Sequence, residues 1–111
     1  MIIFNGLWKN MWRDKKYRRD IKDVEFTNIN LNEYLVIDVR NRREFREGHL
    51  NGAINIPLSD ISKNAEKQIN NRDSRILVYC QYGIRSKKAA SILEDLGYTN
   101  IYNLKGGLEN I

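Results

Sequence analysis

Residues 75–97 read RILVYCQYGIRSKKAASILEDLG, and this stretch decides the fold because it joins an apolar run to a helical pattern. The run at 75–80 is almost continuously apolar, which predicts a strand buried on both faces. The pattern at 86–97 places four apolar residues on one helical face: Ala89, Ile92, Leu93 and Leu96. Gly97 suits the left-handed position that follows a helix. The stretch therefore predicts a strand and a helix, joined by a turn that begins at the single cysteine, Cys80.

The rest of the chain, from about residue 24, alternates between the same two patterns. Short apolar runs predict three more strands, at 34–40, 52–58 and 100–104. Helical turns are expected at 41–49, where Gly48 closes them, and a longer helix is expected at 59–71. Short apolar strands that alternate with helices indicate an α/β domain with a mainly parallel sheet.

The helix predicted at 59–71 has both a start signal and an apolar repeat. Ser59 or Asp60 could cap its first turn through a side-chain oxygen. Its apolar residues recur every four positions: Ile61, Ala65 and Ile69. This spacing is typical of a helix with one buried face.

The bulk composition fits one small globular domain. The chain has 111 residues, of which 41% are hydrophobic and 30% are charged, as in ordinary soluble proteins. Its net charge of +5 comes from residues 9–22, which hold seven basic and two acidic side chains, and the remainder is neutral. The basic character therefore belongs to an N-terminal arm, and nucleic-acid binding by the whole fold is not expected.

The sequence divides into a basic amphipathic N-terminal arm at 1–23 and a domain at 24–111. Apolar residues of the arm stand at helical spacing among the basic ones: Leu7, Trp8, Met11 and Trp12. Three interpretations stay open, in which the arm packs on the protein's own body, binds a protein partner, or lies at a membrane interface. The apolar stripe fades after Trp12, which weakens the membrane interpretation.

The chain has few features of an exported or metal-binding protein. No apolar run approaches the ~20 residues that span a bilayer, and the N-terminus lacks a secretory signal pattern. A single cysteine cannot form an intramolecular disulfide, which fits a reducing compartment. We therefore expect a cytoplasmic protein. With one cysteine and one histidine, a cysteine–histidine metal cluster is not expected.

Cys80 is the candidate nucleophile because of where the predicted elements place it. Ligands of parallel α/β sheets gather at the carboxyl ends of the strands, and Cys80 ends a strand just before a helix. Backbone N–H groups of the turn and the positive end of the helix dipole would lower the pKa of a thiol there. Gly83 permits a tight turn, and Arg85 adds a positive charge. The plainer interpretation is that Cys80 is a small buried apolar residue.

Three segments together resemble the signature motifs of rhodanese domains, in the order and spacing of that family. They are IDVRNRREFREGHLNGAINIP at 37–57, CQYGIRS at 80–86 and LGYTNIYNLKGGL at 96–108. The resemblance covers about residues 34–108 and is strongest to the single-domain sulfurtransferases. It implies a rhodanese-like α/β fold with about five mainly parallel strands and helices on both faces.

The resemblance also implies where the active site lies. Cys80 is then the catalytic residue, and the residues that follow it bind the substrate: Gln81, Tyr82, Gly83, Ile84, Arg85 and Ser86. Arg85, together with Lys87 or Lys88, would attract an anionic donor. The residues themselves leave open whether Tyr82 walls the pocket or is merely exposed.

The implied chemistry is a two-step sulfur transfer. The thiolate of Cys80 attacks the outer sulfur of a small anionic donor such as thiosulfate, sulfite leaves, and a persulfide remains. A thiol or cyanide then accepts that sulfur. No metal or organic cofactor is implied, and the acceptor must be external because the chain has no second cysteine.

Two other functions stay open for this loop. The related fold of cell-cycle phosphatases and some arsenate reductases has the spacing Cys-x5-Arg, whereas Cys80 and Arg85 have the spacing Cys-x4-Arg. The shorter loop fits a single sulfur atom better than a tetrahedral oxyanion. The other alternative is a non-catalytic rhodanese module for sensing or protein binding, although such modules often lose the cysteine that this chain keeps.

Polar residues of the first motif are expected to support the site. Asp38 and Arg40 stand two apart after a strand, so their side chains should point the same way. We expect them to anchor the neighbouring loop by hydrogen bonds and by an ion pair with Glu44. His49 is expected to tie the loop backbone together and not to act as a base.

Two regions depart from the pattern of the family. The stretch before residue 34 is short, and the sequence stops at Ile111, so the helix that usually follows the paired glycines is missing or shortened. Gly106 and Gly107 themselves are expected to serve backbone geometry. The tryptophans of the N-terminal arm could cover the apolar surface that such a helix would hide.

Overall fold

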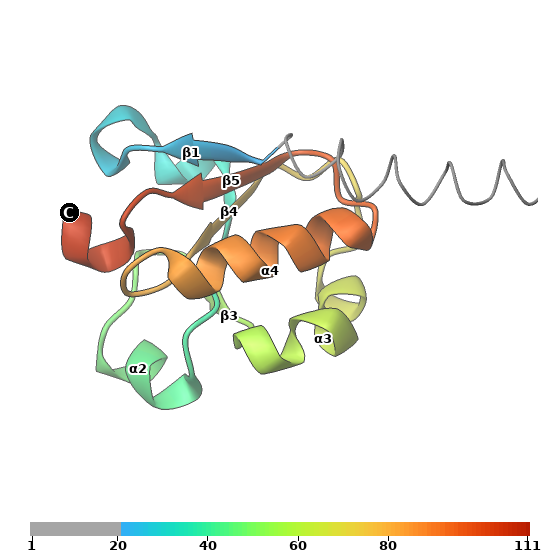
Figure 1. The fold of residues 1–111 in the computed structure, drawn as a ribbon, viewed down its shortest axis with the longest axis horizontal. Coiled ribbons are helices and arrows are strands. Elements are labelled where there is room, and N and C mark those ends of the chain that lie inside the picture. Colours follow the sequence, from blue (N-terminus) through green and yellow to red (C-terminus); the bar gives the residue numbers. More distant parts are fainter. Residues whose placement is uncertain (1–20) are drawn as a thin grey trace, which may run out of the picture.

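Five parallel strands form one sheet, and helices pack against it (Figure 1). The computed structural model describes residues 21–111. The strands are β1 (Lys22–Val24), β2 (Leu35–Asp38), β3 (Ile54–Asn55), β4 (Ile76–Tyr79) and β5 (Ile101–Leu104). Their order in the sheet is β1-β5-β4-β2-β3, and every neighbouring pair is parallel. The structure confirms the predicted α/β class and its parallel sheet.

The central strand β4 is the most buried part of the sheet. All four of its residues are buried, as their continuous apolarity predicts. Its neighbours are β2 on one side, where Val78 pairs with Ile37, and β5 on the other, where Val78 pairs with Asn103. The thiol therefore follows a strand that is buried throughout in a close-packed core.

Strand β1 was not predicted, and the boundary expected between residues 23 and 24 falls inside it. It consists of Lys22, Asp23 and Val24, so it has a single apolar residue and no recognisable alternation. Pairing with β5 holds it at the edge of the sheet, and the N–H of Lys105 donates to the Val24 carbonyl at 2.9 Å. The tertiary partner, and not the local sequence, makes this segment a strand.

The α-helices of the described chain are α2 (Arg42–Glu47), α3 (Ile61–Gln68) and α4 (Ile84–Asp95). A capping box starts α2, because the Asn41 side chain accepts the Glu44 N–H and the Glu44 carboxylate accepts the Asn41 N–H. Gly48 ends this helix as predicted. The left-handed glycine predicted after α4 is also present, since Gly97 has a φ of 97°.

Three details of the predicted elements are wrong. The side-chain cap expected from Ser59 or Asp60 is not made, because a 3₁₀ turn, η4 (Leu58–Asp60), runs directly into α3. The strand expected at 52–58 is reduced to the two residues of β3, which lies at an edge of the sheet and precedes a proline. Helix α4 begins at Ile84, two residues earlier than the predicted position 86.

The two faces of the sheet are covered differently. Helices α3 and α4 pack on one face over buried residues of the sheet and of the helices themselves: Ile37, Val78, Ile61, Ala65, Ala89 and Leu93. The opposite face holds Val36, Leu77, Tyr79 and Leu104. Three 3₁₀-helices contribute apolar side chains to it: η2 (Phe26–Asn28), η3 (Leu31–Glu33) and η5 (Gly107–Asn110). Both faces are therefore covered by helical segments, and those on the second face are single turns.

Several expectations concern the N-terminal arm or absent features. The arm's amphipathic helix, its tryptophans and its proposed partner lie outside the described residues. Within residues 21–111, no helix is long and apolar enough to cross a membrane. The same part of the chain contains no group of three or more histidine, cysteine, aspartate or glutamate side chains that could hold a metal ion.

Candidate active site

Cys80 follows β4 directly, at the carboxyl end of the central strand, as the sequence predicts. Its Sγ atom accepts the backbone N–H of Gly83 at 3.1 Å and that of Ser86 at 3.3 Å. The hydroxyl oxygen of Ser86 lies 3.4 Å from the same sulfur. The loop therefore curls around the sulfur with its donors directed inward.

These surroundings favour the ionised form of the thiol. Burial by itself raises the pKa of Cys80, because a charge is poorly solvated there. The Ser86 hydroxyl and the N–H groups of Ser86, Gly83 and Tyr82 act in the opposite direction, and the net effect is a lowered pKa. Cys80 is only 1% exposed, as a packing role would require. Packing, however, does not explain why donors converge on its sulfur.

The first turn of α4 forms part of this cradle. Gly83 adopts a left-handed conformation with a φ of 95°, and the helix begins at the next residue, Ile84. Ser86 therefore lies in the first turn, where backbone N–H groups have no partner inside the helix. One of these free N–H groups is the donor to Cys80. The first turn of α4 thus supplies one of the donors to the sulfur.

The paired glycines after β5 lie against the outer side of the loop. The N–H of Leu108 donates to the Cys80 carbonyl, and the N–H of Glu109 donates to the Gln81 carbonyl, both at 3.0 Å. A Cβ atom on Gly107 would lie 2.5 Å from each of these two carbonyl oxygens. The structure confirms that Gly107 serves backbone geometry, and it identifies the geometry as a close approach of η5 to the Cys80 loop.

A buried ion pair supports the loop from the other side. The Arg40 guanidinium contacts the Asp38 carboxylate at 2.7 Å, and the side chains are 5% and 0% exposed. Arg40 also donates to the Gln81 side chain at 3.2 Å and to the Gly48 carbonyl at 2.6 Å. These contacts connect the first motif to the residue that follows Cys80, which is the arrangement that the predicted anchoring by Asp38 and Arg40 requires.

The predicted ion pair of Glu44 with this group is wrong, because Glu44 pairs with Arg85. Two guanidinium nitrogens of Arg85 donate to the two carboxylate oxygens of Glu44, at 2.7 and 3.0 Å. The Arg85 guanidinium lowers the pKa of Glu44 to about 2, although partial burial opposes the shift. The two residues are 41 positions apart, so nothing in the local sequence indicates the contact.

The other predicted residues do not contact the sulfur through their side chains. Tyr82 and Ile84 are 65% and 68% exposed, so both flank the loop on its outer surface. Lys88 is exposed as well. The His49 ring stacks on Phe45 and its Nδ1 lies 2.8 Å from the Phe45 carbonyl oxygen. His49 therefore contacts the backbone at the end of α2, which is consistent with the predicted role in holding the loop.

Two supporting contacts were not predicted. The Tyr79 hydroxyl accepts the Leu50 N–H at 3.0 Å, which connects β4 to the first motif. The Gln81 side chain donates to the Glu109 carboxylate, so this side chain is held by structural partners on both sides. The partners are 29 and 28 positions apart, and only a knowledge of the tertiary fold could have paired them.

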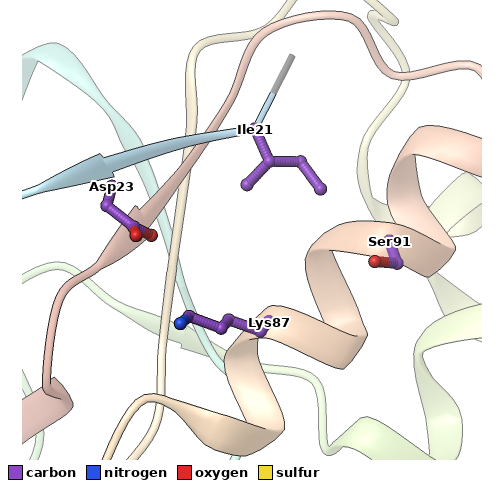
Figure 2. Close-up of a pocket in the computed structure, with 4 residues that line it drawn as sticks. All are labelled: Ile21, Asp23, Lys87 and Ser91. Carbon is purple, nitrogen blue, oxygen red and sulfur yellow. The ribbon is translucent and has the colours of Figure 1, made fainter. Parts of the chain in front are cut away.

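Among the described residues, two depressions lie beside the first turns of α4. One, of about 330 Å³, is lined by Val39, Asn41, Pro57, Leu58, Ser59 and Arg85. The other, of about 230 Å³, lies between β1 and α4 and is lined by Ile21, Asp23, Lys87 and Ser91 (Figure 2). Lys87, which was expected to help attract a donor, extends into this second space. None of the described residues that line it belongs to the loop at 80–86.

Comparison with known proteins agrees with this geometry. The family model of the rhodanese-like domain matches residues 26–111. The chain belongs to the rhodanese-like domain family. The first motif of this rhodanese-like domain holds the Asp38–Arg40 pair, and the second motif is the Cys80 loop. The fold brings these two motifs into contact through Arg40 and Gln81.

Curated relatives of this rhodanese-like domain differ in length and in name. An uncharacterized protein of Bacillus subtilis, YqhL, is 47% identical over 67% of this chain and 57% of its own length. The thiosulfate sulfurtransferase PspE of Escherichia coli is 37% identical over 68% of this chain and 71% of its own length. A tRNA uridine(34) hydroxylase of Buchnera aphidicola is 38% identical, but the chain spans only 29% of it.

A solved structure of similar size has the same fold. The solved structure of a rhodanese with anions from Escherichia coli is 37% identical to this chain, with a TM-score of 0.63. The likeness covers 68% of this chain and 88% of that one. The rhodanese-like fold predicted from the three motifs is therefore confirmed.

Proposed function

We propose that this rhodanese-like domain is a sulfurtransferase, which moves a sulfane sulfur from thiosulfate or a persulfide donor to a thiophilic acceptor through a persulfide on Cys80. The observation that carries the proposal is the convergence of the Gly83 and Ser86 donors on Sγ. Such donors stabilise an anionic sulfur in place without any rearrangement during the reaction. The similarity to a thiosulfate sulfurtransferase supports the same chemistry.

In the first step the Cys80 thiolate attacks the outer sulfur of the donor. With thiosulfate, a bond forms between the two sulfur atoms, the bond to the sulfonate sulfur breaks, and sulfite leaves with the electron pair. Charge is conserved, because a monoanion and a dianion give a persulfide monoanion and sulfite dianion. The N–H groups of the loop stabilise the persulfide as they stabilise the thiolate.

In the second step an external nucleophile removes the sulfur. A thiol, as its thiolate, or cyanide attacks the outer persulfide sulfur, and the Cys80 thiolate is restored as the leaving group. The chain has no other cysteine, so the acceptor comes from outside the sequence described here. The small sulfur donor and this thiophilic acceptor are the partners that the chemistry requires, and the scheme has no step that uses a cofactor.

A non-catalytic module for sensing or protein binding is the second candidate. Two observations favour it, namely the near-complete burial of Cys80 and the engagement of Arg85 by Glu44. A phosphatase or arsenate reductase is favoured less, because the guanidinium that would bind an oxyanion is already paired. Likeness to the tRNA uridine(34) hydroxylases carries no separate proposal, since the chain spans 29% of the protein from Buchnera aphidicola.

The proposed function is tested by sulfur loading. Wild-type protein and Cys80→Ala are treated with an excess of thiosulfate or of benzenethiosulfonate, and intact mass and thiocyanate formation from cyanide are measured. We expect the wild type to gain one sulfur atom from the donors and to form thiocyanate, and the variant to do neither. Both effects depend on a single thiol, so the expected loss in the variant is complete.

The same experiment separates the alternatives. If the folded wild type gains no mass from either donor and forms no thiocyanate, the sulfurtransferase is ruled out and the non-catalytic module takes its place. Release of phosphate from an aryl phosphate by the wild type but not by Cys80→Ala would instead identify a hydrolase.

A further inference from the structure

The Glu44–Arg85 ion pair changes the charge that an incoming donor meets. Arg85 is the cation nearest in sequence to the loop donors, and it was expected to attract an anion. Its guanidinium nitrogens donate to both oxygens of the Glu44 carboxylate, at 2.7 and 3.0 Å. A bidentate pair of this kind uses the planar fork that a sulfonate or sulfate group would otherwise bind.

Glu44 is also held in place independently of Arg85. Its carboxylate accepts the Asn41 N–H at 3.1 Å, and its own N–H donates to the Asn41 side chain at 2.8 Å. The capping box therefore fixes the carboxylate on α2 opposite Arg85. A sulfur donor that binds Arg85 must displace the Glu44 carboxylate. Because α2 holds this carboxylate opposite Arg85, its effective concentration there is high.

The second arginine that reaches the loop is neutralised in the same way. Arg40 donates to the side chain of Gln81, but the Asp38 carboxylate contacts it at 2.7 Å. Each of the two guanidinium groups thus has a carboxylate of its own. An anion at the sulfur is stabilised by the dipoles of the loop N–H groups and of the Ser86 hydroxyl. These dipoles favour one negative charge, but they provide no full positive charge to balance a second negative charge on the donor.

The surface beside Arg85 suits an uncharged group. The depression of about 330 Å³ is lined by three apolar residues, Val39, Pro57 and Leu58, together with Asn41, Ser59 and Arg85. Among the described residues that line it, Arg85 is the one charged side chain, and Glu44 neutralises it. An organic substituent therefore meets little electrostatic penalty in this space.

We propose that Glu44 is a specificity-determining residue, which neutralises Arg85 and so makes the site favour monoanionic organic sulfane donors over dianionic thiosulfate. This inference rests on the proposed sulfurtransferase function and names its class of donor. Organic persulfides and thiosulfonates belong to the favoured class. With a thiosulfonate, the Cys80 thiolate takes the outer sulfur and a sulfinate leaves with the electron pair, so that two monoanions give two monoanions.

The inference is tested with Glu44→Gln and two donors, thiosulfate and benzenethiosulfonate. Glutamine is accepted at the third position of a capping box, so α2 is expected to remain folded. The measured quantity is the ratio of kcat/KM for thiosulfate to kcat/KM for benzenethiosulfonate. We expect Glu44→Gln to raise this ratio about tenfold, mainly through a lower KM for thiosulfate, because it exposes one positive charge to a dianion.

Glu47→Gln is the matched control. It removes the same charge from the same helix, but Glu47 is 65% exposed and contacts only the exposed Arg43 among the ion pairs of the described chain. We expect it to change the ratio less than twofold. Because the ratio is compared between variants, the different intrinsic reactivities of the two donors cancel.

A double variant shows whether the effect passes through Arg85. In the background Arg85→Ala, adding Glu44→Gln is expected to raise the ratio clearly less than in the wild-type background, because no guanidinium fork is then freed to bind the dianion. The inference is overturned if Glu44→Gln leaves or lowers the ratio, if Glu47→Gln raises it equally, or if the increase is as large without Arg85 as with it. Failure of the proposed function looks different, since no variant and no donor would then load sulfur onto Cys80.

Discussion

Replacing Asp38 with alanine is expected to lower the free energy of unfolding by about 3–5 kcal/mol. Asp38 is fully buried and accepts the backbone N–H of Arg40 at 2.9 Å and its guanidinium at 2.7 Å. The substitution leaves the Arg40 charge in the core without a counter-charge. A loss of this size is comparable with the whole stability of a small domain, so urea unfolding should be measured at low temperature, where partial folding can still be quantified.

Two further variants serve as controls for Asp38→Ala. Arg43→Ala removes a guanidinium whose side chain is 84% exposed and paired with Glu47 at 3.5 Å, and we expect it to cost less than about 1 kcal/mol. The double variant Asp38→Ala/Arg40→Leu should be more stable than Asp38→Ala, because no unpaired charge remains buried. If Asp38→Ala costs no more than Arg43→Ala, the buried pair does not anchor the loop.

Replacing Gly107 with alanine is expected to lower both stability and sulfur loading. Its Cβ would lie 2.5 Å from the Cys80 and Gln81 carbonyl oxygens, so η5 and the Cys80 loop must move apart. The left-handed backbone, with a φ of 65°, adds about 1–2 kcal/mol to an overpacking cost of about 1–3 kcal/mol. Urea unfolding and the mass gained from thiosulfate measure the two effects.

Gly52→Ala separates the steric effect from the backbone effect. Gly52 has a similarly left-handed φ of 81°, but a Cβ there would have no neighbour within 4 Å. It should therefore cost about 1–2 kcal/mol and leave sulfur loading intact. Equal stability losses and equal loading in the two variants would show that the close approach of η5 does not hold the Cys80 loop in place.

The parts of the fold that could be predicted are those whose signal is local. β4 is continuously apolar and is buried throughout, and α4 has an apolar repeat and a glycine at its end. The position of Cys80 at the end of a parallel strand follows from these two elements alone. β1 could not be predicted, because two of its three residues are charged and its partner strand supplies the structure.

The site itself was only partly predictable for the same reason. The donors around Cys80 were expected from a turn that leads into a helix. Asp38 and Arg40 were expected to point the same way and to anchor the neighbouring loop, but their ion pair with each other was not predicted. The partner of Glu44 was assigned wrongly, since Arg40 stands in the same motif whereas Arg85 is 41 positions away, and only packing brings Arg85 to Glu44. The role of η5 behind the loop depends on contacts across 28 positions.

The central claim is that converging donors make the Cys80 thiol acidic. It is tested most directly by the pH dependence of thiolate ultraviolet absorbance in the folded wild type, with Cys80→Ala subtracted to remove the tyrosines. The chain has a single cysteine, so the difference reports one group. A pKa clearly below the ordinary value of about 8.5 is the predicted result, and a pKa at or above that value would contradict the account.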